Sequence, residues 1–262
     1  MRNLHFTLLI IAIHFSFTAQ DIGYFGKKTS IEVNVGAKPD FNKRLLYRDT
    51  KLTASLNYGF VIRRQTKSNK GIGFSMSSTK LNFNADDAAM LVPLVSNSSS
   101  YNGSNDLFYG ELAAGMRINR YALFLEIGSK NSTLPIGFSN EIGLGFYTAN
   151  IVDFSYRPST QAYSDFYYSP IPTKATYGLS DLHSNSLKKS GAYFHWRINV
   201  KIPVSESFLI NMSYVSSISF PFNPYYNQYG EQYVFLRDEK PYVQRAAYMD
   251  IGTFKIGGVF VF

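Results

Sequence analysis

The segment KLTASLNYGFVI, residues 51–62, alternates between polar and apolar side chains through most of its length. Leu56, Tyr58 and Phe60 share one parity, whereas Ser55 and Asn57 have the other. Successive side chains of a β-strand point to opposite faces, so a period of two predicts a strand with one apolar and one polar face. The spacing of apolar residues in a helix, by contrast, does not persist here for more than a turn.

The same alternation recurs along the chain. Nine segments show it clearly, with apolar stripes at residues 31–35, 52–62, 72–76, 112–118, 121–127, 142–146, 194–202, 208–214 and 254–262. Most of these segments exceed the ~5–6 residues of ordinary globular strands. They match the roughly 9–11 residues with which a tilted strand crosses a bilayer.

The charged residues near the strand centres fall opposite the apolar stripes. In a water-soluble sandwich this polar face would meet solvent, whereas in a membrane barrel it lines the interior and the apolar stripe faces lipid. Lipid offers no partner to an open sheet edge, so such a sheet must close. We therefore predict an all-β, closed, antiparallel transmembrane barrel. Its expected interior charge network consists of Glu32, Lys51, Glu111, Arg117, Glu126, Glu141, Asp153, Arg197, Lys201 and Lys255.

The number of strands should be even, because both termini are expected on the periplasmic side. The segment IVDFSYR, residues 151–157, supplies a tenth strand, with Phe154 and Tyr156 facing lipid and Asp153 facing inward. We predict about ten strands. The alternative is eight, with the short hairpin held outside the membrane. Leu81 and Phe83 are out of phase with the preceding stripe, which indicates either a bulge or a strand emerging above the membrane.

The connections between these segments fall into two classes. Short connections are expected at residues 63–70, 119–120, 149–150 and 203–206, and long ones at 37–48, 85–105, 158–189 and 221–243. Outer-membrane barrels have short periplasmic turns and long external loops. The short group is therefore assigned to the periplasm and the long group to the cell exterior.

The N-terminus has the pattern of a secretory signal peptide. Arg2 precedes an apolar run at residues 8–17, and the small residues Thr18 and Ala19 follow it. We expect a signal peptide over residues 1–20 and a barrel domain over 21–262. The chain has no cysteine and a net charge of +8, so disulfides are excluded. Export makes nucleic acid an unsuitable partner and favours a surface rich in lipid phosphate.

The chain ends in IGGVFVF, residues 256–262, which resembles the C-terminal assembly signal of bacterial outer-membrane β-barrels. Gly257, Phe260 and Phe262 fit the pattern of glycine, two spacers, aromatic, any residue, aromatic, although Ile256 stands where a polar residue is usual. The chain from residue 21 onward is similar to the small outer-membrane barrel ("porin family") proteins of the Bacteroidota. This resemblance implies insertion by the barrel-assembly machinery and contact with outer-membrane lipid and lipopolysaccharide.

Catalytic chemistry has one candidate in the sequence. Asp181 and His183 resemble the Asp-x-His pair of omptins, which are outer-membrane proteases, and Asp86 with Asp87 could supply the opposing acidic pair. Omptins have Asp-x-Asp there, and this departure weighs against a protease. Beyond the expected signal peptide the chain keeps only His183 and His195 and no cysteine, which weighs against zinc. We expect no cofactor, and we expect His195 to form hydrogen bonds inside the barrel.

Two classes of function follow from these features. The near balance of acidic and basic interior residues favours paired charges that plug the barrel, and hence a structural or interaction role as a loop-presenting barrel or a subunit of an envelope or secretion complex. A small-solute channel is the alternative. Tyrosines in the long loops would contact an envelope protein partner or belong to the external aromatic girdle. The loop candidates are Tyr167, Tyr168, Tyr225, Tyr226 and Tyr229.

Overall fold

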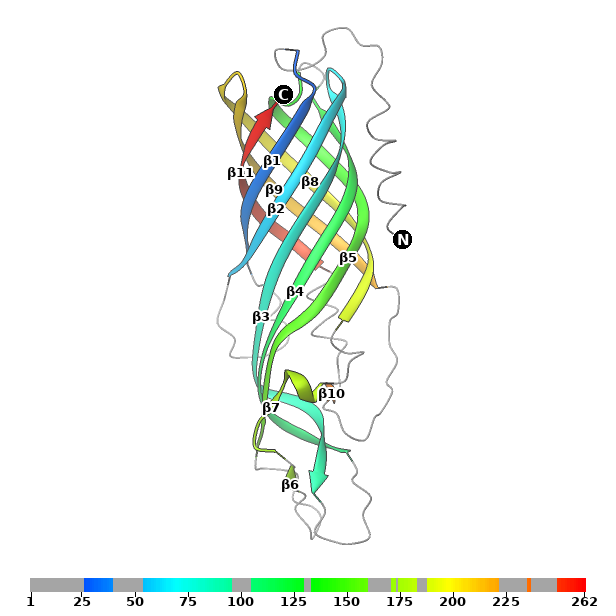
Figure 1. Cartoon of the computed structure of the whole chain (residues 1–262), viewed down its shortest axis with the longest axis vertical. Helices are drawn as coiled ribbons and strands as arrows, with labels where there is room; N and C mark the ends of the chain where they lie inside the picture. The colour runs from blue at the N-terminus through cyan, green and yellow to red at the C-terminus, as the bar shows by residue number, and fades with distance from the viewer. Residues whose placement is uncertain are drawn as a thin grey trace.

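The computed structural model describes residues 26–39, 54–95, 105–129, 133–159, 171–172, 174–182, 188–221, 235–236 and 249–262. In this part of the chain, eight long strands form a closed antiparallel barrel (Figure 1). They are β1 (Thr29–Pro39), β2 (Ala54–Lys67), β3 (Lys70–Val95), β4 (Asn105–Gly128), β5 (Gly137–Pro158), β8 (Lys188–Ser205), β9 (Phe208–Pro221) and β11 (Met249–Val261). Each pairs with the next along the chain, and β1 pairs with β11 to close the barrel.

Three short strands and one short helix accompany the barrel. They are β6 (Ile171–Pro172), β7 (Tyr177–Gly178), β10 (Phe235–Leu236) and the 3₁₀ helix η1 (Leu179–Asp181). Strands β6 and β10 pair with β3, and β7 pairs with β5. Among the described residues, no helix has the length and hydropathy needed to cross a membrane.

The connections separate by length between the two ends of the barrel. One end of the barrel, called here the turn end, contains the hairpins at 68–69 and 206–207 and the connection 129–136. The start of β1 and the end of β11 lie there too. The four predicted long connections join strands at the opposite end, but the prediction for 85–105 is wrong over most of its length, because β3 continues to Val95 and β4 begins at Asn105. The predicted turn at 63–70 is shorter than expected, because β2 continues to Lys67 and includes Arg63.

The strand count is eight and not ten, because two predicted turns do not exist. β4 runs without interruption through Asn119–Arg120, and β5 runs through Ala149–Asn150. Asn119 pairs in register with Ser78 on one side and Thr148 on the other. The predicted pairs of strands on either side of each turn are therefore halves of single long strands. The alternative count of eight is confirmed, although the residues that it assigned to a separate hairpin belong to the long strands β4 and β5.

A reversal of polarity along β4 explains this error. Even-numbered residues face the interior along the described part of the strand. Near the turn end the outer face is apolar and exposed, as at Leu123 and Leu125, whereas farther along Met116 and Ile118 are buried inside and Arg117 is exposed outside. The apolar residues change parity although the backbone does not turn.

β5 and β3 show the same reversal. Phe154 and Tyr156 are buried inside, so the predicted lipid-facing orientation of these two residues is wrong. In β5 the inward-facing parity changes at a register shift, where Val152 has no partner on β4. In β3, Leu81 is buried with no register shift near it, so the predicted bulge is absent and the continuous strand leaves the barrel body there.

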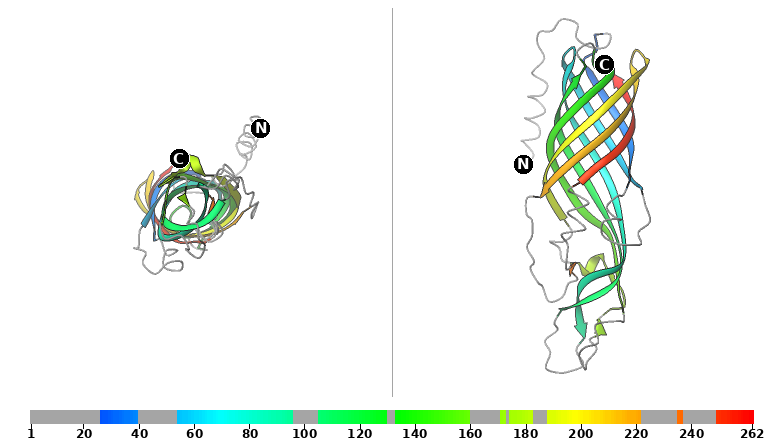
Figure 2. Two further views of the ribbon diagram at one scale, coloured as in Figure 1. Left: turned by 90° about the horizontal axis from the view of Figure 1, so that it is seen from below. Right: turned by 180° about the vertical axis from the view of Figure 1, so that it is seen from behind.

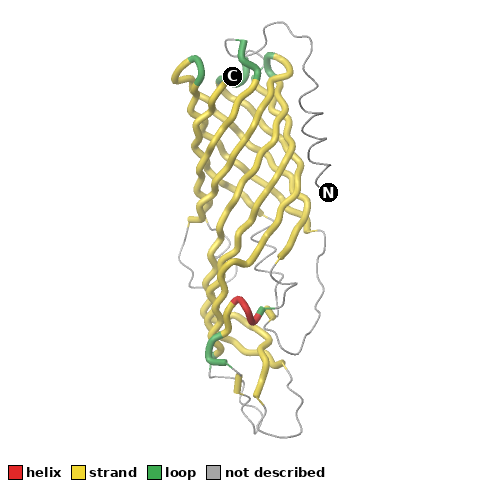
Figure 3. Tube along the Cα trace, viewed as in Figure 1, coloured by secondary structure: helices red, strands yellow, loops and turns green. Residues whose placement is uncertain are grey.

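Strands β3, β4 and β5 extend far beyond the other five strands (Figures 1–3). The extension, called here the projecting sheet, comprises residues 80–95 of β3, 105–118 of β4 and 150–158 of β5. It has its own hydrophobic core, formed by Val92, Phe108, Leu112, Phe154, Tyr156, Tyr177 and Leu182. A second core, which includes Leu81, Met116 and Tyr193, joins it to the barrel body. The Tyr156 hydroxyl donates to the Phe108 carbonyl at 2.8 Å, so its burial leaves no unpaired hydroxyl.

Single-cysteine labelling tests the reversal of polarity, because the natural chain has no cysteine. Arg117 is exposed on the outer face and Met116 is 2% exposed. We expect Arg117→Cys to react with a bulky hydrophilic maleimide at least about ten times faster than Met116→Cys in the folded protein, since thiol reactivity requires access. Faster labelling of Met116→Cys than of Arg117→Cys would instead support the predicted turn at residues 119–120. Labelling of both variants in denaturant provides the control.

Candidate functional site: a buried ion cluster inside the barrel

The interior of the barrel body contains a cluster of charged side chains, all of them at most 4% exposed. Its members come from five strands and are Glu32 of β1, Arg63 of β2, Glu126 of β4, Glu141 of β5, and His195, Arg197 and Lys201 of β8. Each occupies an inward position in the two-residue alternation of its strand. We call this set the ion cluster.

The strand register brings like and unlike charges together. Glu126 and Glu141 are direct cross-strand partners, and Glu141 is also paired with Arg197 on the other side. Like charges directly opposite each other on a sheet are unfavourable. Cations from other strands must therefore reach across the interior to the two glutamates.

Arg63 contacts all three carboxylates. Its Nη1 lies 2.6 Å from Glu32 Oε2, its Nη2 lies 3.1 Å from Glu141 Oε2, and its Nε lies 3.2 Å from Glu126 Oε2. Its guanidinium carbon lies 5.6 Å from the centre of the Phe124 ring, which adds a cation–π contact. A planar guanidinium with five N–H donors suits this role better than an ammonium group.

Arg197 and Lys201 complete the charge pairing. Arg197 donates to Glu32 and lies 3.8 Å from Glu141, while Lys201 donates to Glu126. The cluster therefore sets three carboxylates against three cationic side chains. Buried charges are costly unless they are paired, and this balance makes burial sustainable.

Further polar side chains add hydrogen bonds to the same three carboxylates. Asn34 and Asn211 donate to Glu32 at 2.7 and 3.0 Å, and Ser139 donates to Glu126. His195 Nε2 lies 3.0 Å from Glu141 Oε1. Gly143 of β5 is the cross-strand partner of His195, and the imidazole ring occupies the space beside it. A Cβ at position 143 would stand 2.2 Å from His195 Cε1. Glycine at 143 is thus required for the histidine to fit.

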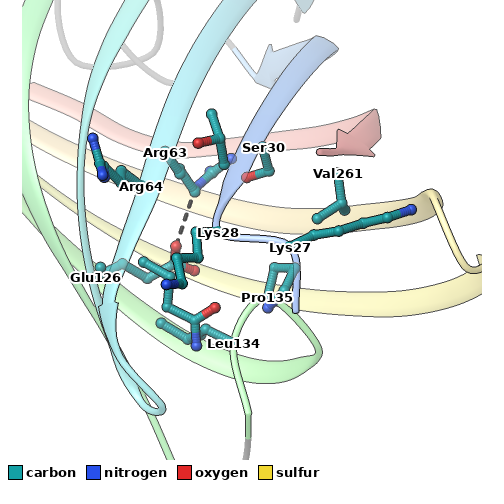
Figure 4. Close-up of a pocket in the computed structure, with 12 residues that line it drawn as sticks. Lys27, Lys28, Ser30, Arg63, Arg64, Glu126, Leu134, Pro135 and Val261 are labelled. Atoms are coloured by element: carbon teal, nitrogen blue, oxygen red, sulfur yellow. Dashed lines mark ion pairs between the residues drawn. The ribbon is translucent and has the colours of Figure 1, made fainter. Parts of the chain in front are cut away.

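Two small cavities flank the ion cluster among the described residues. The cavity at the turn end has a volume of about 20 Å³ and is lined by residues that include Arg63, Glu126 and Pro135 (Figure 4). The cavity on the other side has a volume of about 30 Å³ and is lined by residues that include His195 and Ser217. Each has room for one or two water molecules. At these two places the described side chains leave little free space beside the ion cluster.

An apolar contact closes the turn end further. Leu209, Val259 and Val261 form a buried interior cluster, and Ile136 of the connection between β4 and β5 packs against it. In the same connection, the backbone N–H of Leu134 donates to the carbonyl of Ser68 at 2.8 Å. Figure 4 shows Leu134 and Pro135 beside Lys28 at this end.

The structure places five of the ten predicted interior charges in the ion cluster: Glu32, Glu126, Glu141, Arg197 and Lys201. Lys255 is half-buried at an inward position, and Lys51 lies outside the described residues. The prediction is wrong for Glu111, Arg117 and Asp153, which are exposed on the outer face of the projecting sheet. Glu111 and Asp153 there approach Arg157 and Lys80, respectively. These three errors follow from the reversal of polarity in β4 and β5.

The central residue of the cluster was missed in the sequence. Arg63 was assigned to a periplasmic turn, although it continues the inward parity of Asn57, Gly59 and Val61. That continued alternation is the signal that could have identified it. His195, by contrast, was predicted on the interior face beside Arg197, and the structure places it there.

The described part of the structure does not show the catalytic candidates assembled in one site. Asp181 lies in η1, where its carboxylate accepts from the Gly178 N–H at 2.8 Å and from Lys174 Nζ. Burial opposes ionisation, but these two hydrogen bonds outweigh it and lower the pKa of Asp181. Asp86 and Asp87 lie where the register of β3 shifts, and His183 lies outside the described residues. No group of potential metal ligands occurs in the described part of the chain.

The C-terminal residues predicted as an assembly signal lie on β11 and, for Phe262, directly after it. Phe260 and Phe262 face outward and are exposed, whereas Gly257 faces inward between β1 and β9. A Cβ at Gly257 would stand 2.7 Å from the Val33 carbonyl oxygen and 2.8 Å from Asn34 Cβ. Glycine is therefore also needed for the close approach of β11 to β1. The five loop tyrosines lie outside the described residues.

No protein-family model and no curated protein matches this sequence. Among solved structures, the chain is similar to Ail, the attachment invasion locus protein of Yersinia pestis. The identity is 10%, the match covers 90% of this chain and 99% of Ail, and the TM-score is 0.41; for Ail in complex with the heparin analogue sucrose octasulfate it is 0.40. A major outer membrane protein from Thermus thermophilus is 9% identical, with 89% and 99% covered and a TM-score of 0.39. Such values do not transfer function to this chain.

Removal of the central cation tests the importance of the cluster. Arg63→Gln leaves three buried carboxylates with two permanent partners, so we expect unfolding free energy to fall by roughly 3–5 kcal/mol. Denaturant-induced unfolding in detergent, followed by the shift in gel migration, measures it. Arg117→Gln is the matched control and should change stability by less than about 0.5 kcal/mol. Equal stability of the two variants would contradict the central role of Arg63.

Proposed function

We propose that the chain is an integral outer-membrane β-barrel with a closed interior, and that it acts by presenting the projecting sheet and its loops to a partner outside the membrane. The observation that carries the closed interior is the ion cluster around Arg63. The projecting sheet carries the interaction role. The membrane location rests on the outer surface of the barrel body.

The outer surface of the barrel body is apolar around its whole circumference. Each of the eight strands contributes exposed side chains, among them Val33, Leu56, Phe74, Leu123, Leu144, Trp196, Met212 and Phe254. Soluble proteins rarely expose contiguous apolar patches of more than a few hundred Å². A closed barrel with an apolar outside and a polar inside is the arrangement of outer-membrane proteins. We call this surface the apolar belt and place it in lipid.

The orientation follows from the connections. Short turns face the periplasm in outer-membrane barrels, and long loops face the exterior, so the turn end is assigned to the periplasm. Residues 1–20 would then serve as the cleaved signal peptide, and the exposed Phe260 and Phe262 would be recognised by the barrel-assembly machinery. Outer-membrane lipid and lipopolysaccharide are the expected neighbours of the belt.

The projecting sheet is the part best suited to meet a partner. β3 contains 26 residues, and at ~3.3 Å per residue it is about 85 Å long. A tilted strand needs only roughly 9–11 residues to cross the bilayer. More than half of β3 is then available beyond the membrane. Its separate hydrophobic core makes this extension an ordered platform for the long loops.

The described residues support no catalytic role. Asp181 uses its carboxylate in a local turn with Gly178 and Lys174, which accounts for its position without a reaction. We therefore propose that the chain is not a protease.

Conductance in planar bilayers tests the closed interior. Folded wild-type protein should give no steady channels of porin size, because charged side chains and small cavities occupy the barrel. A variant that truncates both arginines of the cluster, Arg63→Ala with Arg197→Ala, should give measurable current, provided that its gel migration shows it to be folded. Steady large channels from the wild-type protein would instead support the small-solute channel.

Site-specific photo-cross-linking tests the interaction role. A photoreactive amino acid at position 117, on the exposed face of the projecting sheet, should yield a discrete protein adduct in the native envelope. The same group at position 123, within the apolar belt, should yield lipid adducts and serves as the matched control. If position 117 and neighbouring outward positions give no protein adduct, the interaction role is wrong even where the barrel is inserted.

A further inference from the structure

The rim at the turn end carries a group of cationic side chains with exposed aromatic side chains to either side. Arg64, Lys67 and Lys70 lie on the hairpin between β2 and β3. Exposed phenylalanines lie two strands away from this hairpin in either direction: Phe138 on β5, and Phe260 and Phe262 at the end of β11 and directly after it. We call the first group the basic hairpin. Aromatic residues commonly anchor barrels at membrane interfaces, but they leave the cations unexplained.

The basic hairpin borders the apolar belt directly. Arg64 follows the exposed Ile62 by two residues on the outer face of β2, and it pairs in register with the exposed Ile72 of β3. Lys70 precedes Ile72 by two residues on the same outer face. On both neighbouring strands, therefore, the outward side chains change from apolar to cationic between one outward position and the next. This is the level at which lipid headgroups would meet the barrel.

Hydrogen bonds order the backbone of the hairpin that carries these cations. Gln65 Nε2 donates to the Ser68 carbonyl at 2.8 Å, and Thr66 Oγ1 donates to the Lys70 carbonyl at 3.2 Å. The Gln65 backbone N–H donates to the Lys28 carbonyl at 2.8 Å, which ties the hairpin to β1. An ordered scaffold loses little entropy when it binds a ligand.

The arrangement is electrostatically unfavourable without an anion. Lys67 and Lys70 are direct cross-strand partners, and like charges in such pairs repel. Among the described residues, no carboxylate forms an ion pair with Arg64, Lys67 or Lys70. An anionic group placed against the hairpin would relieve this repulsion.

We propose that the basic hairpin binds the phosphate groups of anionic phospholipids in the periplasmic leaflet. The inference rests on the membrane location proposed above. Cationic side chains next to a membrane attract anionic lipids, arginine can grip phosphate with two N–H groups, and lysine stems lie along apolar surface while their ammonium groups reach the interface. A lipid fits better than a soluble acidic protein, because the cations begin where the apolar belt ends.

Tryptophan quenching by brominated lipids measures binding at this site. Trp196 is the only tryptophan, and β8 lies four strands away from β2 in the barrel. The native Trp196 therefore reports on the opposite side. A variant with Trp196→Phe and Phe74→Trp moves the reporter to β3, near the basic hairpin. Both proteins are placed in vesicles of phosphatidylcholine mixed with phosphatidylglycerol, with bromine on the acyl chains of one lipid at a time.

We expect phosphatidylglycerol to be favoured over phosphatidylcholine by at least about five-fold at position 74 and by less than about two-fold at Trp196. The preference at position 74 should fall with added salt and should persist when inorganic phosphate is present, which separates a lipid site from a free-phosphate site. The triple variant Arg64→Gln, Lys67→Gln and Lys70→Gln should abolish it. The matched control removes the same charge from the projecting sheet through Lys80→Gln, Arg117→Gln and Arg157→Gln and should retain it.

Three results would overturn the proposal: equal quenching by both lipids at position 74, an equal preference at Trp196, or a preference that survives the triple substitution in the hairpin. Displacement by inorganic phosphate would also overturn it. A different result would contradict the proposed membrane location itself. If neither brominated lipid quenches either reporter, the barrel is not in the bilayer, and the lipid site falls with it.

Discussion

One guanidinium group connects the walls of the barrel. Arg63 reaches from β2 to carboxylates on β1, β4 and β5, so strands that are far apart around the circumference meet through a single side chain. This is possible only in a narrow barrel, since the diameter grows with the number of strands and eight strands leave an interior that side chains can fill. The size of the barrel and the charge balance of its interior therefore depend on one another.

The three long strands pass through two environments that demand opposite patterns. In the barrel body the outside is apolar and the inside is charged; in the projecting sheet, Leu112 and Phe154 are buried inside while Glu111 and Asp153 meet solvent outside. The pairing of β3 with β4 continues unchanged through the boundary, whereas β5 shifts its register there at Val152. In β3 and β4 side-chain chemistry alone marks where one environment ends, because burial in each case follows what surrounds the strand.

Much of the fold could be predicted from the sequence, because alternation and the lengths of connections are local signals. They indicate a closed antiparallel barrel with short turns at one end. The strand count could not be obtained in the same way. A change of apolar parity at Asn119 has the same appearance whether the chain turns or whether its surroundings change, and only the pairing of β4 with β3 and β5 distinguishes the two.

The same ambiguity limited the prediction of the site. Glu32, Glu141 and Arg197 could be placed inside because their strands have one polarity across the barrel body. The role of Arg63 could not be predicted, since its three contacts join residues 31 to 78 positions away along the chain. Such contacts depend on barrel closure and on side-chain reach. Periodicity within one strand contains no information about either.

The continuous pairing of β3 with β4 has a mechanical consequence. The ladder runs from Lys70 opposite Ile127 to Pro93 opposite Asn105, with one register shift between Ala85 and Ala88. A pull on the far end acts along the strands and loads the hydrogen bonds that join β3 to β2 and β5 to β8 in shear, while the described ladder of β3 and β4 contains no loop that could serve as a hinge. The tip is therefore held at a set distance from the barrel wall, and a force applied there is transmitted to the wall itself.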